Sequence, residues 1–455
     1  MSVFLNKILE ALCNDGLVLE CKEIVLKPLS GGTDRNQHSG PGSVVQQRDG
    51  TFLIKAYCQG PIHPKQVYAP FLLTRPGKLV EEKEYYLVEI KDFDNMSWIS
   101  DPVIPRFISG LDFDGYIVQA SCRKLSTRTV FPVPPVGNPI NIIYRGAITV
   151  PSNAVTRTEM KIGDRVESQG WNRNVAKFTA AGLEFEMVSG PDALDVYATG
   201  GDGTNSHSLV DRISEALQFV LGRILSWSYI EMYNDKILTI VISAAGRNET
   251  RSRVGPPIAF GGVDQDGSVW RLFDRYLSHV VDYKQEAWHP IFRRIRSVLI
   301  SGGASIEAHA LTLSVDIEGL LHDAFPSIGL YSEEYKEKVK ETHGLICGST
   351  VDLDIKRRIL GFVENMVFPR GEDRLRVLRD AGMIDKRLID NWKNLRHPSA
   401  HGEADWRDLQ KYVQRCNSAL ALFYQLIFLA IGYVGRCTDY NMDGYPQVQF
   451  EKVLS

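Results

Sequence analysis

The chain has 455 residues, of which 44% are hydrophobic and 24% are charged, and its formal net charge is −3. A chain of this length is too long for one simple core, so we expect two or three domains with the composition of a soluble globular protein. The small negative charge excludes a protein that attracts nucleic acid over its whole surface, so any RNA contact must come from a local basic patch.

The beginning of the chain and its cysteines indicate a cytoplasmic protein. The first 17 residues carry Lys7, Glu10 and Asp15 and lack a basic start followed by an apolar block, which argues against a secretion signal. There is no run of 20 apolar residues, so we expect no membrane contact. The seven cysteines are scattered without CxxC pairs, which is typical of free thiols in a reducing compartment, although Cys13 and Cys21 could lie close together by accident.

Residues 1–200 are predicted to form a β-rich sensor or regulatory domain. Short segments rich in β-branched and aromatic residues alternate there with Gly- and Pro-containing turn signals. The predicted strands are 51–57, 79–93, 115–120, 140–144 and 183–187, a spacing typical of an antiparallel sandwich or barrel. The segment 30–50 is rich in Gly, Ser, Gln and Arg but lacks the lysine and the strand-to-helix setting of a P-loop, so we predict a mobile loop there.

Residues 205–270 are predicted to be a mixed α/β connecting segment. The run from Gly200 to Asn205 is too rich in glycine for the interior of a helix or strand and marks a domain boundary. After it, apolar residues at helical spacing predict a helix over 210–224, and 236–243 is predicted to be a strand. Asp264 to Gly267 matches a fragment of a calcium-binding loop, but the remaining acidic ligands are missing, so we expect a plain turn.

Residues 271–455 are predicted to form a helical bundle, which makes the fold class α+β. Three apolar stripes should supply its core: Ile291, Ile295, Val298 and Leu299; Ile306, Leu313, Ile317, Leu320 and Leu321; and Ile355, Ile359, Phe362 and Val363. Asp316 and Glu318 lie within the second stripe. An acid there could reach Arg396 and His401 and fix their orientation, but we favour a solvent-exposed helix face for both.

The segment 391–402 carries the strongest indication of chemistry. An apolar stripe upstream predicts an amphipathic helix, and Pro398 predicts that this helix stops at Arg396 or His397. In an unbroken helix Arg396 and His401 would point about 140° apart, because each residue adds about 100°. We therefore expect a break at Pro398 that brings both side chains to one side.

Arg396 and His401 are suited to cutting RNA without a metal. A guanidinium is a permanent cation that matches phosphate oxygens, and an imidazole, with an unperturbed pKa of about 6.5, exchanges protons near neutrality. The pair is also short enough to recur by chance, and an arginine at a helix C-terminus is a favourable partner for the macrodipole. His397 and His401 have the spacing of zinc peptidases, but Pro398 disrupts that helix and no glutamate follows His397, so we expect neither a metal nor another cofactor.

The sequence after the motif continues with helical periodicity. A stripe over 406–416 leads into the apolar run 420–434, in which Gln425 is the only strongly polar side chain. This run is short for a bilayer and is predicted to be a helix buried in the domain core or against a partner subunit. Basic residues beside the motif are candidates for a local RNA-binding patch, although charges on a helix are often only its solvated face. They are Lys386, Arg387, Lys393, Arg407, Lys411 and Arg415.

Arg396, followed after four residues by His401 and directly by the polar His397, resembles the motif of the HEPN superfamily of ribonucleases. The order of an amphipathic helix, this motif, a second long helix and the segments 432–436 and 439–444 is similar to the C-terminal module of HEPN defence proteins. The resemblance implies a helical domain in which two protomers bring their motifs together across a dimer interface. It also implies attack of the substrate's own 2′-hydroxyl on the neighbouring phosphate, which leaves a cyclic phosphate and a 5′-hydroxyl.

Carried over to this chain, the resemblance implies that Arg396 stabilises a phosphorane-like transition state and that His401 is the general acid or base. His397 and Lys393 would support the pair or contact RNA. Such charge stabilisation is commonly worth about 3 to 4 kcal/mol per donor, and a positioned proton-transfer group accelerates a reaction by about 100- to 10,000-fold.

A β-rich front and a HEPN-like rear on one chain resemble the ApeA-type bacterial anti-phage proteins, which are thought to shut down infected cells by attacking RNA. By this analogy the front half would sense a phage-derived trigger or restrain the nuclease. Two alternatives from other classes stay open. One is a non-catalytic HEPN-like adaptor that binds RNA, a nucleotide or a partner, and the other is a metal-dependent hydrolase whose activity a chelator would abolish.

Overall fold

The computed structural model of the chain describes residues 3–29, 36–62, 77, 79–109, 114–131, 135–162, 165–200, 207–245, 254–264, 266–285, 288–401 and 408–454. Within these ranges the side chains at 3–6, 109, 156–162, 165–172 and 397–401 lie outside the description. The chain divides into two compact units. Unit 1 comprises residues 1–210, 225–249 and 261–265, and unit 2 comprises 211–224, 250–260 and 266–455.

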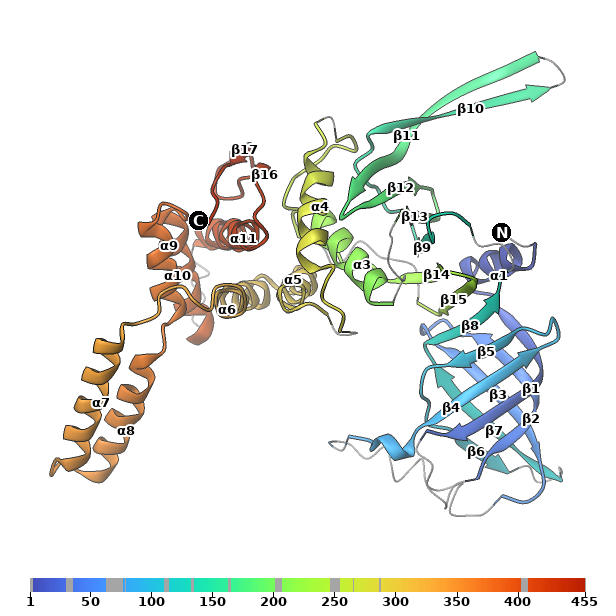
Figure 1. Ribbon diagram of the computed structural model, residues 1–455, viewed down its shortest axis with the longest axis horizontal. Coiled ribbons are helices and arrows are strands. Elements are labelled where there is room, and N and C mark those ends of the chain that lie inside the picture. Colours follow the sequence, from blue (N-terminus) through green and yellow to red (C-terminus); the bar gives the residue numbers. More distant parts are fainter. Residues whose placement is uncertain are drawn as a thin grey trace. The chain divides into compact units, whose positions relative to one another are not determined.

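The two units confirm the α+β class in its coarse form, with a sheet-rich N-terminal part and a helical C-terminal part (Figure 1). The segment 205–270, which we predicted to be a connector, is shared between them. Most of its helix belongs to unit 2, and its strands belong to unit 1.

Unit 1 is built on one continuous antiparallel sheet, which has fifteen strands within the described residues. Its order is β10-β11-β12-β13-β9-β14-β15-β8-β5-β4-β1-β2-β3-β7-β6. The strands are β1 (Val18–Pro28), β2 (His38–Gln46), β3 (Phe52–Gln59), β4 (Tyr86–Asp92), β5 (Ser97–Ser100), β6 (Arg106–Ser109), β7 (Gly115–Cys122), β8 (Lys124–Val130), β9 (Ile140–Arg145), β10 (Ala154–Ile162), β11 (Arg165–Ala180), β12 (Leu183–Ser189), β13 (Ala193–Thr199), β14 (Trp227–Asn234) and β15 (Ile237–Ser243). The predicted strands at 51–57, 115–120, 140–144, 183–187 and 236–243 are confirmed.

The strands β1 to β8 curve around a shared apolar core (Figure 1). Alternate residues of β3 and β7 are buried, as period-2 burial on one face of a sheet requires. Helix α1 (Val3–Cys13) adds Ile8 and Leu12 to this core. The segment 79–93 is a strand only in part, because the short 3-10 helix η1 (Glu82–Glu84) precedes β4.

The loop that we predicted over 30–50 is wrong for residues 38–46, which form β2 between β1 and β3. The glycines there serve a close approach of two backbones. A Cβ atom at Gly40 would lie 1.9 Å from the carbonyl oxygen of Tyr57, and one at Gly42 would lie 1.9 Å from the carbonyl oxygen of Lys55. Glycine is therefore required at both positions by contact with β3. Residues 30–35 lie outside the described part of the chain.

We expect Gly42→Ala to destabilise unit 1 by about 1 to 3 kcal/mol or more, because the new methyl group must push β2 away from β3. Chemical unfolding followed by circular dichroism measures the change. Gly261→Ala is the matched control, since no atom lies within 4 Å of the Cβ position there. Equal unfolding midpoints for the two variants would show that the strands do not approach as described.

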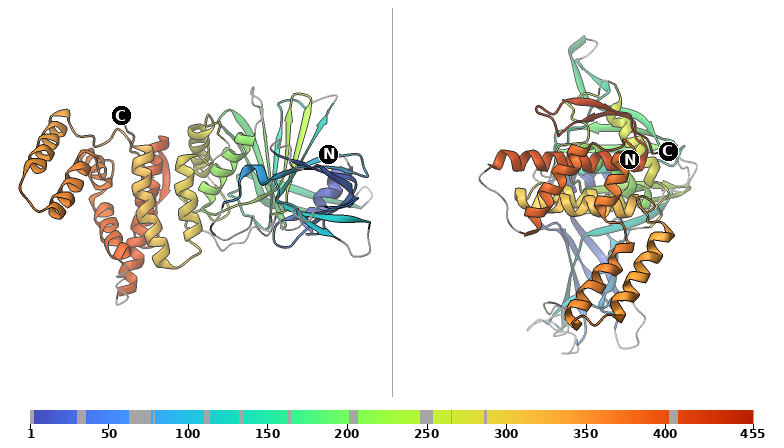
Figure 2. Two further views of the ribbon diagram at one scale, coloured as in Figure 1. Left: turned by 90° about the horizontal axis from the view of Figure 1, so that it is seen from below. Right: turned by 90° about the vertical axis from the view of Figure 1, so that its left-hand side faces the viewer.

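Unit 2 is mainly helical, with a short hairpin near its C-terminal end (Figure 1). Its elements, apart from the first turn of α3, are α3 (His207–Leu221), α4 (Ser268–Val280), α5 (Pro290–Ser301), α6 (Ile306–Ala324), α7 (Glu333–Gly348), α8 (Leu353–Glu364), η2 (Asn365–Val367), α9 (Gly371–Asp380), α10 (Lys386–His401), α11 (Leu409–Ile431), β16 (Gly435–Thr438) and β17 (Gln447–Phe450). Helix α6 packs against α5, α10 and α11, and α10 packs against α11. Figure 2 shows α5, α6, α10 and α11 side by side.

Local signals set the ends of the helices that form this bundle. Ser305 caps α6 by accepting a hydrogen bond from the backbone N–H of Ala308 at 3.3 Å. Asp408 caps α11 in the same way, at 3.1 Å from the N–H of Lys411. Gly432 ends α11 in the left-handed region, with φ 63°. Nearly all residues of α11 from Ser418 onward are buried, which confirms the predicted buried helix. None of the described helices meets the length and hydropathy of a membrane span.

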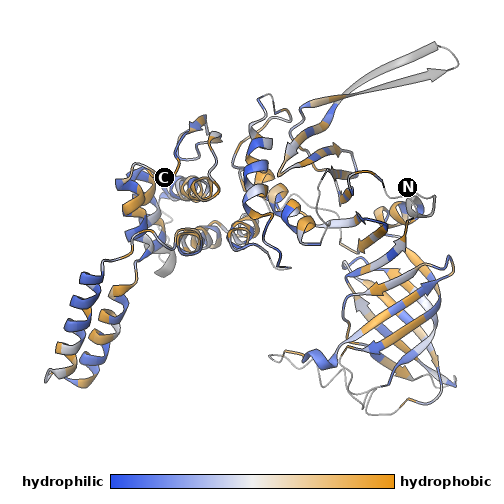
Figure 3. Cartoon of the chain, viewed as in Figure 1, coloured by the Kyte–Doolittle hydropathy of each residue, from blue (hydrophilic) through white to orange (hydrophobic). Residues whose placement is uncertain are grey.

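The helices α7 and α8 form a hairpin. The core stripe that we predicted in α8 is wrong for three of its four residues. Ile355 and Phe362 are 53% and 57% exposed, and Ile359 is also exposed, whereas Val363 is buried. The reason is that α8 packs mainly on α7 and η2, so only part of its apolar stripe has a partner in the bundle. Figure 3 shows hydrophobic residues along this hairpin among polar ones. The stripes of α5 and α6 are buried as predicted, except at Ile306.

Candidate functional site

The helix that carries the motif, α10, runs from Lys386 to His401 without stopping at Pro398. The predicted break is wrong. Proline in a helix removes one backbone donor, which here would have bonded to the carbonyl of Asn394. Pro398 lies in the last turn of α10, so the missing hydrogen bond affects only the C-terminal end of the helix. Upstream, Leu388, Trp392 and Leu395 are buried and hold the helix against the bundle.

The continuous helix changes how Arg396 and His401 relate within one chain. Positions five residues apart on a regular helix are rotated by about 140°. We expected a bend that brings the two positions to one side, but α10 has no such bend. The side chains of His397 and His401, and residues 402–407, lie outside the description.

Arg396 is held in place by a carboxylate and an aromatic ring while its guanidinium stays accessible. Its Nη2 lies 2.9 Å from Oε1 of Glu318 in α6, and its side chain is 45% exposed. The guanidinium carbon lies 5.7 Å from the ring centroid of Trp392, one turn earlier in α10. Trp392 is fully buried, and its indole N–H donates to the carbonyl of Ser314 at 3.4 Å.

Asp316 and Glu318, the two acidic residues within the predicted stripe of α6, do not simply lie on a solvated face. Glu318 orients Arg396, which is the alternative that we had considered less favoured. Asp316 is buried and forms an ion pair with Arg294, whose Nη1 lies 3.5 Å from Oδ1 of Asp316. Burial raises the pKa of the Asp316 carboxyl, and hydrogen bonds from Ser297 and Arg294 oppose this shift.

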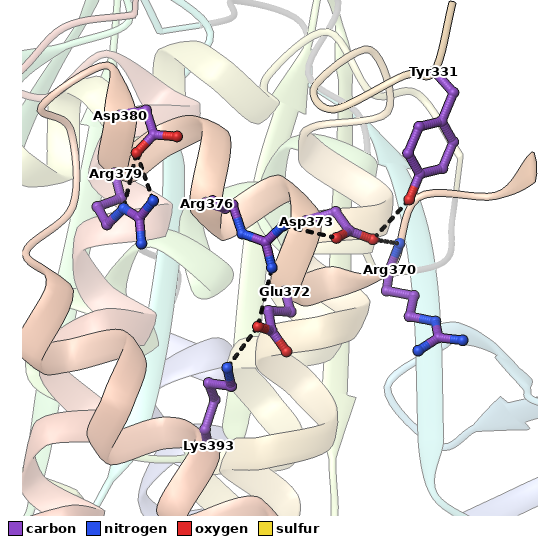
Figure 4. Close-up of polar contacts among 8 residues, drawn as sticks. All are labelled: Tyr331, Arg370, Glu372, Asp373, Arg376, Arg379, Asp380 and Lys393. Carbon is purple, nitrogen blue, oxygen red and sulfur yellow. Dashed lines mark hydrogen bonds and ion pairs between the residues drawn. The ribbon is translucent and has the colours of Figure 1, made fainter. Parts of the chain in front are cut away.

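Lys393 forms an ion pair with Glu372 at the surface of unit 2. Its Nζ lies 2.5 Å from Oε1 of Glu372 in α9, and Nη2 of Arg376 lies 3.3 Å from the same oxygen. Figure 4 shows Lys393 of α10 reaching this carboxylate beside Arg376. The hydrogen bond from Lys393 holds the pKa of the Glu372 carboxyl below its usual range. An RNA phosphate at Lys393 would have to compete with this carboxylate.

A polar hollow of about 550 Å³ lies between α10, the first half of α11 and the loop after β16. We call it the amide hollow, because six amide side chains line it: Asn391, Asn394, Gln410, Gln414, Asn417 and Asn441. Two residues of the predicted basic patch, Lys411 and Arg415, also line it. Among the other candidates, Arg387 pairs with Asp385, Lys386 is exposed, and Arg407 lies outside the described residues.

The sequence analysis missed the amide side chains, although a signal for them exists. Gln410, Gln414 and Asn417 follow the i, i+4, i+7 spacing that places three side chains on one face of a helix. Asn391 and Asn394 are likewise three residues apart in α10. Such rows of amides on two neighbouring helices predict a polar site from the sequence. The participation of Asn441 could not be predicted, because it depends on how the loop after β16 folds back.

The described residues contain no group of three or more His, Cys, Asp or Glu side chains that could hold a metal ion. None of the seven cysteines, all within the described residues, forms a disulfide bond.

Comparison of the chain with protein-family models, with curated proteins and with solved structures gives no match.

We expect Arg396→Ala to stay folded. A half-exposed ion pair contributes about 0 to 1 kcal/mol, and a cation–π contact at an exposed site about 0.5 to 1 kcal/mol, so the melting temperature should fall by a few degrees at most. Differential scanning calorimetry measures the shift. Trp392→Ala should cost about 3 to 5 kcal/mol in comparison, because it empties a fully buried position. A large loss of stability in Arg396→Ala would instead assign the arginine a structural role.

Proposed function

We propose that the chain is a metal-independent endoribonuclease of a bacterial anti-phage system that causes abortive infection. The observation that carries the proposal is the state of Arg396: an accessible guanidinium, oriented by Glu318 and Trp392, on the helix that also carries His401. The motif lies on α10, which packs against α6 and α11, and the proposal takes this helical region to be the HEPN-like domain.

The proposed reaction is a transesterification within RNA. The substrate's 2′-oxygen forms a bond to the adjacent phosphorus, and the bond from phosphorus to the 5′-oxygen breaks. A base takes the proton of the 2′-hydroxyl, and an acid returns a proton to the leaving 5′-oxygen, with His401 in one of these roles. Arg396 stabilises the extra negative charge that develops on the phosphoryl oxygens. The products are a 2′,3′-cyclic phosphate and a 5′-hydroxyl.

The continuous α10 helix supports a site made from two copies of the chain. Because positions 396 and 401 are rotated by about 140°, one copy would supply the arginine and the other the histidine to the same phosphodiester. A homodimer, or a higher homo-oligomer, is then part of the proposal. We further propose that unit 1 senses a phage-derived trigger or restrains cleavage in the bacterial cytoplasm, since an unrestrained ribonuclease would harm its own cell.

We expect Arg396→Ala and His401→Ala each to reduce RNA cleavage by at least about 100-fold, because the first removes charge stabilisation and the second a proton-transfer group. Induction of the intact chain and each variant in bacteria, followed by sequencing of RNA ends, measures cleavage and end chemistry together. Arg387→Ala is the control, since it removes an exposed arginine of α10 that is paired with Asp385 just before the helix. Purified protein should cut equally well with and without a chelator.

Unchanged cleavage in both site variants would refute the Arg/His chemistry. Loss of activity in chelator would favour the metal-dependent hydrolase. One observation favours the non-catalytic adaptor as second candidate: both Arg396 and Lys393 are paired with carboxylates inside unit 2, as structural residues often are. That candidate predicts no RNA ends from the intact chain under any trigger.

A mixture of Arg396→Ala and His401→Ala protomers should recover activity that neither variant has alone. In a mixed dimer one shared site lacks both groups, while the other keeps Arg396 of one copy and His401 of the other. With random pairing, half the dimers are mixed and half their sites are intact, so we expect about a quarter of the wild-type rate. The measurement is the cleavage rate of the unfractionated mixture obtained by co-expressing equal amounts of the two variants. A mixture as inactive as its components would place both groups in one copy.

A further inference from the structure

We infer that the amide hollow binds one nucleotide of single-stranded RNA, with its base among the amides and its phosphate on Lys411 and Arg415. This inference rests on the proposed function, since it names where that substrate is held. The volume of about 550 Å³ lies within the range of small-ligand sites, about 300 to 1,000 Å³. Its lining is dominated by polar side chains from unit 2 alone.

The amide side chains match the edge of a nucleobase. Each amide offers a donor N–H₂ and an acceptor oxygen, the pattern that Asn and Gln use to read base edges. Some of them are already fixed. Asn391 Nδ2 donates to Ser418 Oγ at 3.0 Å, and Ser418 Oγ donates to Asn441 Oδ1 at 2.6 Å. This chain of hydrogen bonds ties α10, α11 and the loop together, so the floor of the hollow is preorganised.

Tyr445 offers an aromatic ring on which a base can stack. Its side chain is 46% exposed and lines the hollow, and its hydroxyl accepts a hydrogen bond from Asn417 Nδ2 at 2.8 Å. Its backbone lies in the left-handed region, with φ 49°, which is unfavourable for a bulky residue. Proteins that recognise single-stranded RNA commonly stack unpaired bases on such rings.

Lys411 and Arg415 supply a site for the phosphate. They are four residues apart in α11, so their side chains lie on one face and repel each other unless an anion lies between them. Neither forms an ion pair with any other described residue. Lys411 also lies in the first turn of α11, where the helix dipole favours an anion. The acidic residue of the lining is Asp443, whose carboxylate can accept from a base N–H group.

The hollow lies on the side of α10 away from Arg396. Asn394 and Arg396 are two residues apart and are therefore rotated by about 200°, whereas position 401 is seven residues after Asn394 and returns to within about 20° of it. A nucleotide in the hollow would thus lie along the α10 face that continues to position 401. In the proposed two-copy site, this strand would meet the partner's arginine at the neighbouring phosphate.

The test measures binding in a chain that cannot turn over its substrate. Full-length protein with Arg396→Ala is titrated against a fluorescent, mixed-sequence RNA hexanucleotide, and anisotropy is read at several salt concentrations. Adding Lys411→Gln and Arg415→Gln should weaken binding by roughly ten- to a hundredfold. It should also reduce the slope of log K against log salt by roughly 0.7 to 1.4, as expected for one or two lost phosphate contacts on a single strand.

The control is Lys386→Gln with Arg387→Gln in the same background, which removes two positive charges from α10 outside the hollow. We expect this control to bind within about twofold of its parent, because neither side chain contacts the proposed nucleotide. Tyr445→Ala should weaken RNA binding without changing the salt slope, since stacking releases no counterions. Equal affinities for the hollow variant and the control would overturn the inference.

Competition experiments distinguish RNA from a free nucleotide as the ligand of the hollow. Together with cleavage assays, they also distinguish failure of this inference from failure of the proposed nuclease. Nucleoside monophosphates should displace the RNA only at concentrations far above that of the RNA itself, because they engage one site without its neighbours. Displacement by a free nucleotide as efficiently as by RNA would overturn RNA as the ligand and assign the hollow to a nucleotide. Binding that depends on Lys411 and Arg415, combined with no cleavage by the intact chain, would keep the hollow and refute the nuclease.

Discussion

The packing of Trp392 against α6 sets the position of Arg396, on which the proposed chemistry depends. Its buried indole donates to the carbonyl of Ser314, and this contact fixes the register of α10 on α6. One turn further along both helices, Arg396 meets Glu318. The equal spacing of four residues on the two helices makes the ion pair a consequence of the tryptophan contact. The guanidinium is thus oriented by the bundle core and not by the surface around it.

The continuity of α10 follows from the same packing and determines what the motif can do. Local preference disfavours the helical region before a proline, yet the buried residues of α10 hold the backbone in a helix through Pro398. The rotation that results separates positions 396 and 401 within one chain. This separation gives the proposed dimer a chemical reason, because in the proposal a second copy supplies the partner group. The same rotation turns position 401 toward the face of α10 that borders the amide hollow.

Sequence patterns predicted what depends on local periodicity and missed what depends on tertiary contacts. The strand at 140–144 and the buried helix α11 follow from β-branched runs and an apolar run, which need no knowledge of neighbours. The strand β2 was missed because its glycines resemble a loop, and only the contact with β3 explains them. Pro398 misled the helix prediction for a related reason, since core packing outweighed a local signal. The pairing of Glu318 with Arg396, and the hollow around Asn441, require the fold itself.

The ion pairs of the resting chain are compatible with phosphate binding, because their strength is small. A pair as exposed as Arg396 and Glu318 contributes about 0 to 1 kcal/mol, so an RNA phosphate that offers bidentate hydrogen bonds can replace the carboxylate at little cost. In the proposed complex Lys393 would undergo the same exchange at Glu372, where Arg376 would remain to neutralise the carboxylate. At Arg396 the displaced Glu318 has no such second cation among the described ion pairs and must turn to solvent. In the proposed complex with RNA, displacing Glu318 from Arg396 would therefore cost more free energy than displacing Glu372 from Lys393.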